Sequence, residues 1–333
     1  MFDLIRFHSR LNPELPGLVA FDSSARELSY ADIARRVDAV THRLAQCAIA
    51  PGLRIGINCH DRLLHIIAVL ALSRTGDATF VFASDGLFKP GSIDVLVTDK
   101  AVGNGDRPMV VVLDAQATAV PMPERAVADR GGNTTWLFNG IALEGEVLRA
   151  RIAQRSTAKA AGGATRWLCA ADIRTELGLS AVIECLWSGG LAILSNGTFS
   201  QDVLPIRLYE ADHLLVDGEH AADYLNGFDK ANGMSARLRS AVIVGACPEI
   251  SAAERMKRFI SPDTVLHLDL PETGTFAACS YWQIGKPRHY WPLPGVELCL
   301  VANGQVPDAN APAHVAIRSD GALRSRDGAL ILS

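Results

Sequence analysis

Apolar residues recur along the chain in short runs that are separated by amphipathic stretches. Runs of this kind predict strands at 54–58, 80–82, 93–97, 109–113, 136–138, 166–169, 191–194, 213–216, 241–244 and 265–268. Helical patterns lie between several of these runs. Alternation of strands and helices over this length predicts an α/β fold with mostly parallel, buried sheets and packed helices.

Two helix starts are marked by their polar residues. Ser29 and Asp32 have the spacing of a capping box. Four apolar residues behind them fall on one helical face: Ile33, Val37, Val40 and Leu44. A second, strongly apolar helix is predicted over 62–75, and Gly76 ends it. His60 and His65 flank its start, and we expect them to cap or cover it.

Residues 133–152 raise a question of chemistry. The apolar triplet 136–138 ends in Asn139-Gly140, and a helical pattern begins at about Glu144. The pattern predicts strand, turn and helix, which is the joint where many nucleotide enzymes hold phosphate. This turn contains a single glycine, no lysine, and no serine or threonine beyond the strand.

The pattern changes after about residue 275. Short β-like runs at 275–280, 296–301, 314–318 and 330–332 are separated by turns, with no helical pattern between them. They predict a small, barrel-like β subdomain. With the loop-rich stretch 101–134 as a joint, we divide the chain into three parts: an α/β subdomain over 1–134, a second over 135–274 and the β-rich subdomain over 275–333.

Composition narrows the functional classes. The chain has 333 residues, of which 49% are hydrophobic and 20% charged, which favours a folded globular protein. A net charge of −4 without a basic run argues against nucleic acid and anionic membranes as partners. The sequence has no signal peptide or transmembrane stretch, so a cytoplasmic location is expected. Seven cysteines without a C-x-x-C pair, and histidines without ligand spacing, indicate reduced thiols and no metal site.

Several segments, taken in order, resemble the adenylate-forming superfamily of acyl-CoA synthetases, aryl-acid ligases and peptide-synthetase adenylation domains. Residues 28–82 resemble its N-terminal run of helix, turn, strand, apolar helix and strand. Later segments match the family's further motifs, and the most specific is PLPGVEL within 284–301. The resemblance covers nearly the whole chain. It implies two similar mixed sheets with packed helices and a reaction of a carboxylate with ATP to an acyl-adenylate and pyrophosphate.

The resemblance also implies a set of site residues. Glu272 matches the glutamate that holds magnesium and serves catalysis, although it matches equally a polar residue at a strand end. Asp327 matches the ribose-binding aspartate or, equally, an Asp-Gly turn. The nucleotide-contacting positions that the resemblance implies are Gly245, Ala246, Cys247, Asp269 and Asp327. The Gly245 turn has an alternative role as a plain strand-to-helix connection, and Cys247 one as a thiol nucleophile.

The chain departs from the family pattern at the positions that handle the triphosphate. TWLFNGIALEGE stands at 135–146, where the family has a glycine- and hydroxyl-rich loop with a lysine. Pro271 replaces the threonine before the magnesium glutamate, and AADIRTELGL at 170–179 lacks the family's histidine. The sequence ends at Ser333, before the family's C-terminal domain with its catalytic lysine would follow.

These departures predict a degenerate member of the family. We expect a non-catalytic or impaired subunit that binds a small carboxylic acid or acyl group, or that acts as a scaffold for a carrier protein or sister biosynthetic enzyme. ATP or AMP with Mg²⁺ are the cofactors that the resemblance suggests, and the departures argue against them. The alternative is a minimal acid-adenylating ligase whose lysine domain comes from another chain.

Overall fold

The computed structural model describes most of the N-terminal two thirds of the chain and separate strands beyond them. The described residues are 2–21, 25–47, 50–74, 76, 78–83, 88–89, 91–100, 109–113, 134–138, 141–159, 165–226, 238–245, 250–270, 274–279, 282–286, 288–292, 297–301, 314–318, 322–324 and 330–332.

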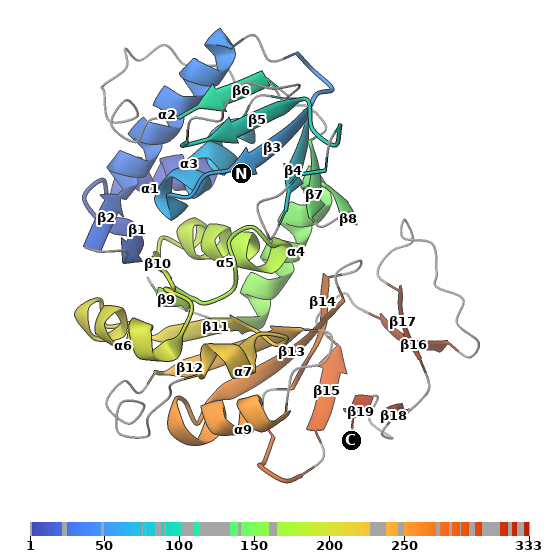
Figure 1. The fold of residues 1–333 in the computed structure, drawn as a ribbon. Coiled ribbons are helices and arrows are strands. Elements are labelled where there is room, and N and C mark those ends of the chain that lie inside the picture. Colours follow the sequence, from blue (N-terminus) through green and yellow to red (C-terminus); the bar gives the residue numbers. More distant parts are fainter. Residues whose placement is uncertain are drawn as a thin grey trace. The chain divides into compact units, whose positions relative to one another are not determined.

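The chain forms two compact units (Figure 1). The first comprises Met1–Ala150, Gly163–Thr165 and Asp172–Leu194, and the second Arg151–Gly162, Arg166–Ala171 and Ser195–Ser333. The division falls within helix α4 (Gly145–Lys159). The subdomain boundaries that the sequence predicts at 134/135 and 274/275 stay predictions.

The first unit contains a mixed six-stranded sheet. Its strands lie in the order β6-β5-β3-β4-β7-β8, and all neighbours are parallel except β7 and β8. These strands are β3 (Arg54–Asn58), β4 (Thr79–Phe82), β5 (Val95–Thr98), β6 (Met109–Val112), β7 (Thr135–Phe138) and β8 (Ile141–Glu144). β3 lies between β4 and β5, the next two strands of the sheet along the chain, so the sheet grows from β3 in both directions, as in a doubly wound sheet. The predicted α/β architecture is confirmed here.

Helix α3 (Arg62–Leu72) follows β3 and is buried on nearly all sides. Ten of its eleven residues are buried, from Leu63 through Leu72. A helix that is apolar all round belongs in the interior, which is what its sequence RLLHIIAVLAL predicts. One of the ten buried residues, His65, is polar.

A second set of strands in the first unit joins residues distant in sequence. β1 (Pro16–Phe21) pairs in parallel with β10 (Leu191–Leu194) and antiparallel with β2 (Ala25–Ser29). Two more helices of this unit are α1 (Asp3–Leu11) and α5 (Glu176–Trp187).

Helix α2 (Tyr30–Gln46) begins as its sequence predicts. Ser29 accepts a hydrogen bond from the Asp32 N–H and Asp32 accepts from the Ser29 N–H, which confirms the capping box. The predicted apolar face is buried along its length: Ile33, Val37, Val40 and Leu44.

The second unit holds a mixed sheet with a parallel part and an antiparallel part (Figure 1). Strands β9, β11, β12 and β13 are parallel, and β14, β15, β19 and β18 continue them in antiparallel order. Their bounds are β9 (Arg166–Cys169), β11 (His213–Asp217), β12 (Ser240–Gly245), β13 (Thr264–Leu270), β14 (Gly274–Cys279), β15 (Arg288–Pro292), β18 (Ala322–Arg324) and β19 (Leu330–Leu332). The helices of this unit are α6 (Phe199–Leu208), α7 (Ala221–Tyr224) and α9 (Ile250–Phe259).

The predicted β-rich subdomain is described only as separate strands. Beyond those above, β16 (Glu297–Val301) pairs in parallel with β17 (His314–Arg318). A barrel built from these strands stays a prediction.

Candidate functional site

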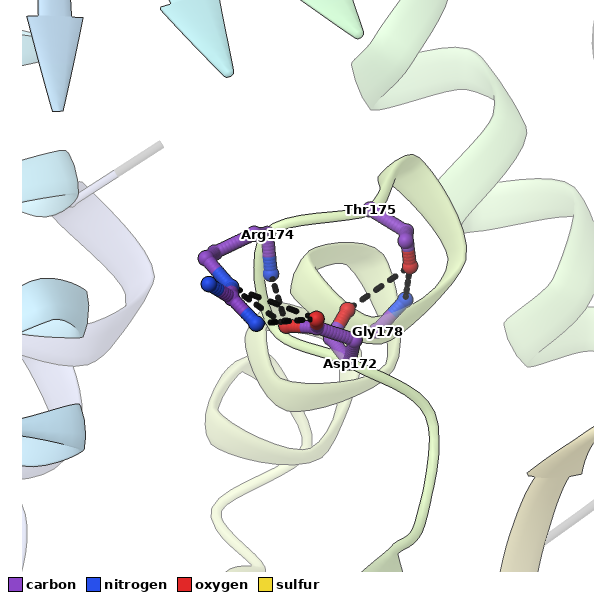
Figure 2. Close-up of polar contacts among 4 residues, drawn as sticks. All are labelled: Asp172, Arg174, Thr175 and Gly178. Carbon is purple, nitrogen blue, oxygen red and sulfur yellow. Dashed lines mark hydrogen bonds and ion pairs between the residues drawn. The ribbon is translucent and has the colours of Figure 1, made fainter. Parts of the chain in front are cut away.

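A short loop between β9 and α5 carries a tightly paired carboxylate and guanidinium (Figure 2). The Asp172 carboxylate accepts hydrogen bonds from three nitrogens of Arg174. The backbone N–H donates to Oδ1 at 2.9 Å, Nε donates to both oxygens at 3.1 and 3.2 Å, and Nη2 donates to Oδ2 at 2.7 Å. Both side chains are about one third exposed, so water screens their charges and the ion pair adds little stability. Its main effect is to hold the loop in one conformation through several hydrogen bonds.

Thr175 connects this loop to the start of α5. Its hydroxyl donates to the Asp172 carbonyl oxygen at 2.7 Å and accepts from the Gly178 N–H at 3.2 Å (Figure 2). Thr175 is therefore the N-cap of the helix. Local hydrogen bonds thus hold the segment 170–179, which lacks the histidine of the family pattern. It presents the Asp172 carboxylate, which is paired with Arg174.

His65 is fully buried in α3 rather than placed at its start. Among the described residues neither ring nitrogen has a hydrogen-bond partner. Burial lowers the pKa of His65 to about 4; the charge of Asp172 opposes this shift, that of Arg174 adds to it and that of Asp99 opposes it. The prediction that His65 caps or covers the helix is wrong, because its position in an all-apolar helix puts it inside.

The N-cap of α3 is Asp61, and a second aspartate holds the turn before it. Asp61 Oδ1 accepts from the N–H groups of Leu63 and Leu64 at 2.9 and 3.2 Å. Asp99, just after β5, accepts from the N–H of Asp61 at 2.7 Å and of His60 at 3.0 Å. Partial burial would raise the pKa of Asp99, but these N–H donors outweigh it and lower the pKa.

In the stretch 135–146, where the resemblance implies a phosphate loop, the described residues form two paired strands and the start of α4. β7 and β8 pair antiparallel from Thr135 with Glu144 to Phe138 with Ile141. The prediction of strand, turn and helix is wrong at 141–144, where a second strand precedes α4. The side chains of β8 alternate in exposure, with Leu143 buried between exposed neighbours. Antiparallel pairing with β7 therefore directs an apolar side chain of β8 into the interior. Asn-Gly between two apolar runs is a hairpin signal that could have been read from the sequence.

Aromatic rings pack this hairpin onto the sheet. Phe82 of β4 stacks on Phe138 with ring centroids 4.7 Å apart, and on Trp136 at 5.8 Å. The His65 ring lies 6.2 Å from that of Phe82. Trp136 is buried and, among the described residues, its indole N–H has no acceptor. The hairpin is thus part of the hydrophobic core.

In the second unit the structure describes two of the predicted nucleotide-contacting residues, Gly245 and Asp269. Gly245 ends β12, and the loop after β11 passes close to it, since a Cβ on Gly245 would lie 3.4 Å from Gly218 Cα. Such a distance is an ordinary contact, so the position does not require glycine for space. Asp269 lies in β13 and pairs with Thr275. Ala246, Cys247, Glu272 and Asp327 lie outside the described residues.

The described part of the chain contains neither a candidate metal site nor a candidate membrane-spanning helix. No group of three or more His, Cys, Asp and Glu side chains there could hold a metal ion. Its helices also fall short of the length and apolarity that a bilayer crossing demands.

Comparison with solved structures gives the fold a class. O-succinylbenzoate CoA synthetase (MenE) from Bacillus subtilis in complex with AMP aligns with a TM-score of 0.73 at 16% identity, over 99% of this chain and 97% of that one. The Klebsiella oxytoca NpsA N-terminal subdomain in complex with 3-hydroxyanthranilyl-AMSN aligns with a TM-score of 0.68 at 15% identity, over 89% and 79%. An artificially fused adenylation-PCP di-domain, NpsA-ThdA from K. oxytoca, aligns at 0.67 and 14%, over 89% and 58%.

The chain has the fold of the N-terminal domain of adenylate-forming enzymes. It spans 58% of the fused protein and 64% of one MenE structure. No protein-family model and no curated protein matches the sequence.

Proposed function

We propose that this protein is a non-catalytic carboxylate- or acyl-binding subunit with an adenylate-forming fold. The observation that carries the proposal is the pairing of Phe138 with Ile141, which leaves only Asn139 and Gly140 between two strands. The family resemblance puts the phosphate loop in this segment. Of the stretch 135–146, ten residues belong to β7, β8 and the start of α4.

A triphosphate needs several N–H groups or hydroxyls free to point at it, because its charge must be offset by fixed dipoles or cations. In an antiparallel hairpin the backbone N–H groups of the closely spaced pairs are used by the partner strand. At the start of α4 the Gly145 N–H already donates to the Thr134 carbonyl oxygen at 2.8 Å, and the Glu146 carboxylate opposes an anion. The residues present in this segment therefore do not fit the phosphates of ATP with Mg²⁺.

The acid partner and the protein partner are proposed by analogy with the neighbours. One neighbour is an N-terminal subdomain in complex with an aryl-AMSN compound, and another is an adenylation domain fused to a PCP. An N-terminal unit of this fold can thus hold a ligand without a further domain. We propose that this chain keeps the acyl part of such binding and docks a carrier protein or a sister enzyme.

Calorimetric titration with MgATP and then with AMP tests the loss of nucleotide binding. We expect no heat of binding for either one. B. subtilis MenE, which has been crystallised with AMP, is the positive control under the same conditions. Micromolar binding of ATP or AMP by this chain would overturn the proposal.

Retained acyl binding is tested separately by thermal shift against a panel of aryl and alkyl carboxylic acids, and by mass spectrometry of the native protein. We expect at least one acid or acyl group to raise the melting temperature. If no acid raises the melting temperature and the mass spectrum shows no bound group, the acyl-binding role is excluded and only the scaffold role is left.

The second candidate function is a minimal acid-adenylating ligase. It is favoured by the alignment over 99% of this chain with an AMP-bound synthetase. Pyrophosphate exchange that depends on an acid would support it, with the lysine supplied by another chain. Glu272→Ala would then abolish the exchange. Exchange that is absent across the acid panel excludes this candidate.

A further inference from the structure

Helix α1 exposes an apolar stripe on the first unit. Leu4, Phe7 and Leu11 are 47%, 54% and 56% exposed. They are three and four residues apart, so they lie on one face of the helix. Leu15, just beyond the helix end, is also exposed. Large apolar side chains that line up on one exposed face mark a contact surface more often than single exposed leucines do.

The opposite face of α1 already has its partners within the chain. Phe2 and Ile5 are buried, and the Arg6 guanidinium bonds Asp38 at 2.7 Å and lies over the Phe2 ring. His8 Nε2 is 2.9 Å from the Trp187 carbonyl oxygen. The helix is therefore fixed on the unit by these contacts, and the exposed stripe is not the face by which α1 folds.

Two opposite charges flank the stripe along the same side of α1. Asp3 lies at its start and Arg10 near its end, seven residues apart, which is close to two helical turns. Both residues are exposed. A partner that presented an arginine beside Asp3 and an aspartate beside Arg10 would match this pattern.

We propose that the occupant is a second copy of the chain, with the two α1 helices packed antiparallel about a two-fold axis near Phe7. In a two-fold contact the same patch meets itself. Antiparallel packing brings Leu4 near Leu11 of the partner subunit. Positions on the same flank then face each other in reverse order, so Asp3 faces Arg10 of the partner subunit and the reverse. In a parallel two-fold pair this flank of each helix lies on the opposite side of the contact, so Asp3 and Arg10 would not meet their counterparts in the other copy.

The interface is small. One nine-residue helix per copy buries less than the roughly 1,200 Å² at which standard protein interfaces begin. We therefore expect a weak dimer, with a Kd on the order of 100 µM. The inference rests on α1 alone and is independent of the proposed acyl-binding function.

Sedimentation equilibrium of the whole chain from about 5 to 500 µM tests the dimer. We expect a monomer–dimer equilibrium that Phe7→Glu abolishes. Leu204→Glu, at a 62% exposed leucine of α6 in the second unit, is the matched control and leaves the equilibrium unchanged. A chain that stays monomeric throughout the range overturns the proposal, and the stripe then serves another partner.

Charge reversal at Asp3 and Arg10 tests the antiparallel arrangement. Both residues are exposed, so we expect the variants to fold. Asp3→Arg alone and Arg10→Asp alone each set like charges opposite each other, and we expect self-association about tenfold weaker. An equimolar mixture of the two variants restores both opposite pairs, so the mixture associates at least as well as the parent chain. Equal weakness of the mixture and the single variants overturns the antiparallel contact.

Discussion

The Tyr30 hydroxyl donates a hydrogen bond to the Gly190 carbonyl oxygen at 2.8 Å, joining residues 160 apart in sequence. It also lies 3.1 Å from the Leu186 carbonyl oxygen. The side chain is fully buried, and burial raises the pKa of the phenol well above its usual range. The Tyr30 side chain thereby connects the start of α2 to the end of α5 within the first unit.

Tyr30→Phe keeps the ring and removes this tie. The buried Gly190 carbonyl oxygen would lose the hydroxyl donor, so we expect the free energy of unfolding to fall by about 1–3 kcal/mol. Urea denaturation monitored by circular dichroism measures it. An unchanged midpoint would mean that water replaces the hydroxyl at no cost.

Gly189→Ala is expected to destabilise the first unit through two separate effects. Gly189 has φ +74, and a Cβ there would lie 2.9 Å from His8 Cε1. A left-handed backbone costs an L-residue about 1–2 kcal/mol, and the contact adds to this cost. The matched control is Gly52→Ala, with φ +83 and no atom within 4 Å of the new Cβ. Equal losses in thermal melts of the two variants would exclude a role for the His8 contact.

Acid is expected to destabilise the protein through His65. Its pKa is about 4 in the folded chain and about 6.5 in the unfolded one, so the unfolded state binds more protons between these values. The contribution of neutral His65 to the free energy of unfolding is therefore fully present above about pH 6.5. It falls by about 3 kcal/mol as the pH drops towards 4.

His65→Leu tests this titration because it removes the imidazole and keeps an apolar side chain in the helix. Urea midpoints at about pH 7.5 and pH 5 should differ less in this variant than in the parent chain. His220→Leu, at a largely exposed histidine, is the matched control for the loss of an imidazole. A parental slope in the His65 variant would assign the acid sensitivity to other groups.

A buried carboxylate organises the second unit and should be costly to change. Asp202 is fully buried and accepts hydrogen bonds from the Ser195 hydroxyl, from the Asn196 N–H at 2.8 Å and from the Tyr224 hydroxyl at 3.1 Å. Asp202→Asn would turn an amide towards these donors. We expect it to cost about 2–4 kcal/mol and Tyr224→Phe about 1–2 kcal/mol in chemical denaturation. Equal costs would argue against the carboxylate as the centre of the group.

Much of the fold was readable from local patterns. The capping box at Ser29 and Asp32, the buried face behind it, and strands such as β3, β9 and β10 agree with the structure. Each depends on residues within one or two turns of each other, or on a continuous apolar run between turn residues. Strands β1, β2, β8, β15 and β18 were not predicted. β8 and β18 are short, β2 and β15 mix charged residues into the strand, and β1 begins with Pro-Gly, a typical turn signal.

The site residues depended on more than local pattern. The resemblance placed Glu272, Asp327 and the Gly245 turn by order along the chain, and only Gly245 lies in the described part with its contacts. The hairpin at Phe138 and Ile141 was signalled by Asn-Gly, but a helix pattern beginning at Glu144 hid the short second strand.

The sequence by itself determined the alternation of strands and helices, their caps, and the loss of the lysine and hydroxyls from the expected phosphate loop. Tertiary structure alone decided that the Tyr30 hydroxyl bonds the Gly190 carbonyl oxygen and that the Asp61 N–H donates to Asp99. The physical reason is range. Periodicity and capping act between neighbours in the chain, whereas burial and hydrogen-bond partners depend on which distant segments pack together.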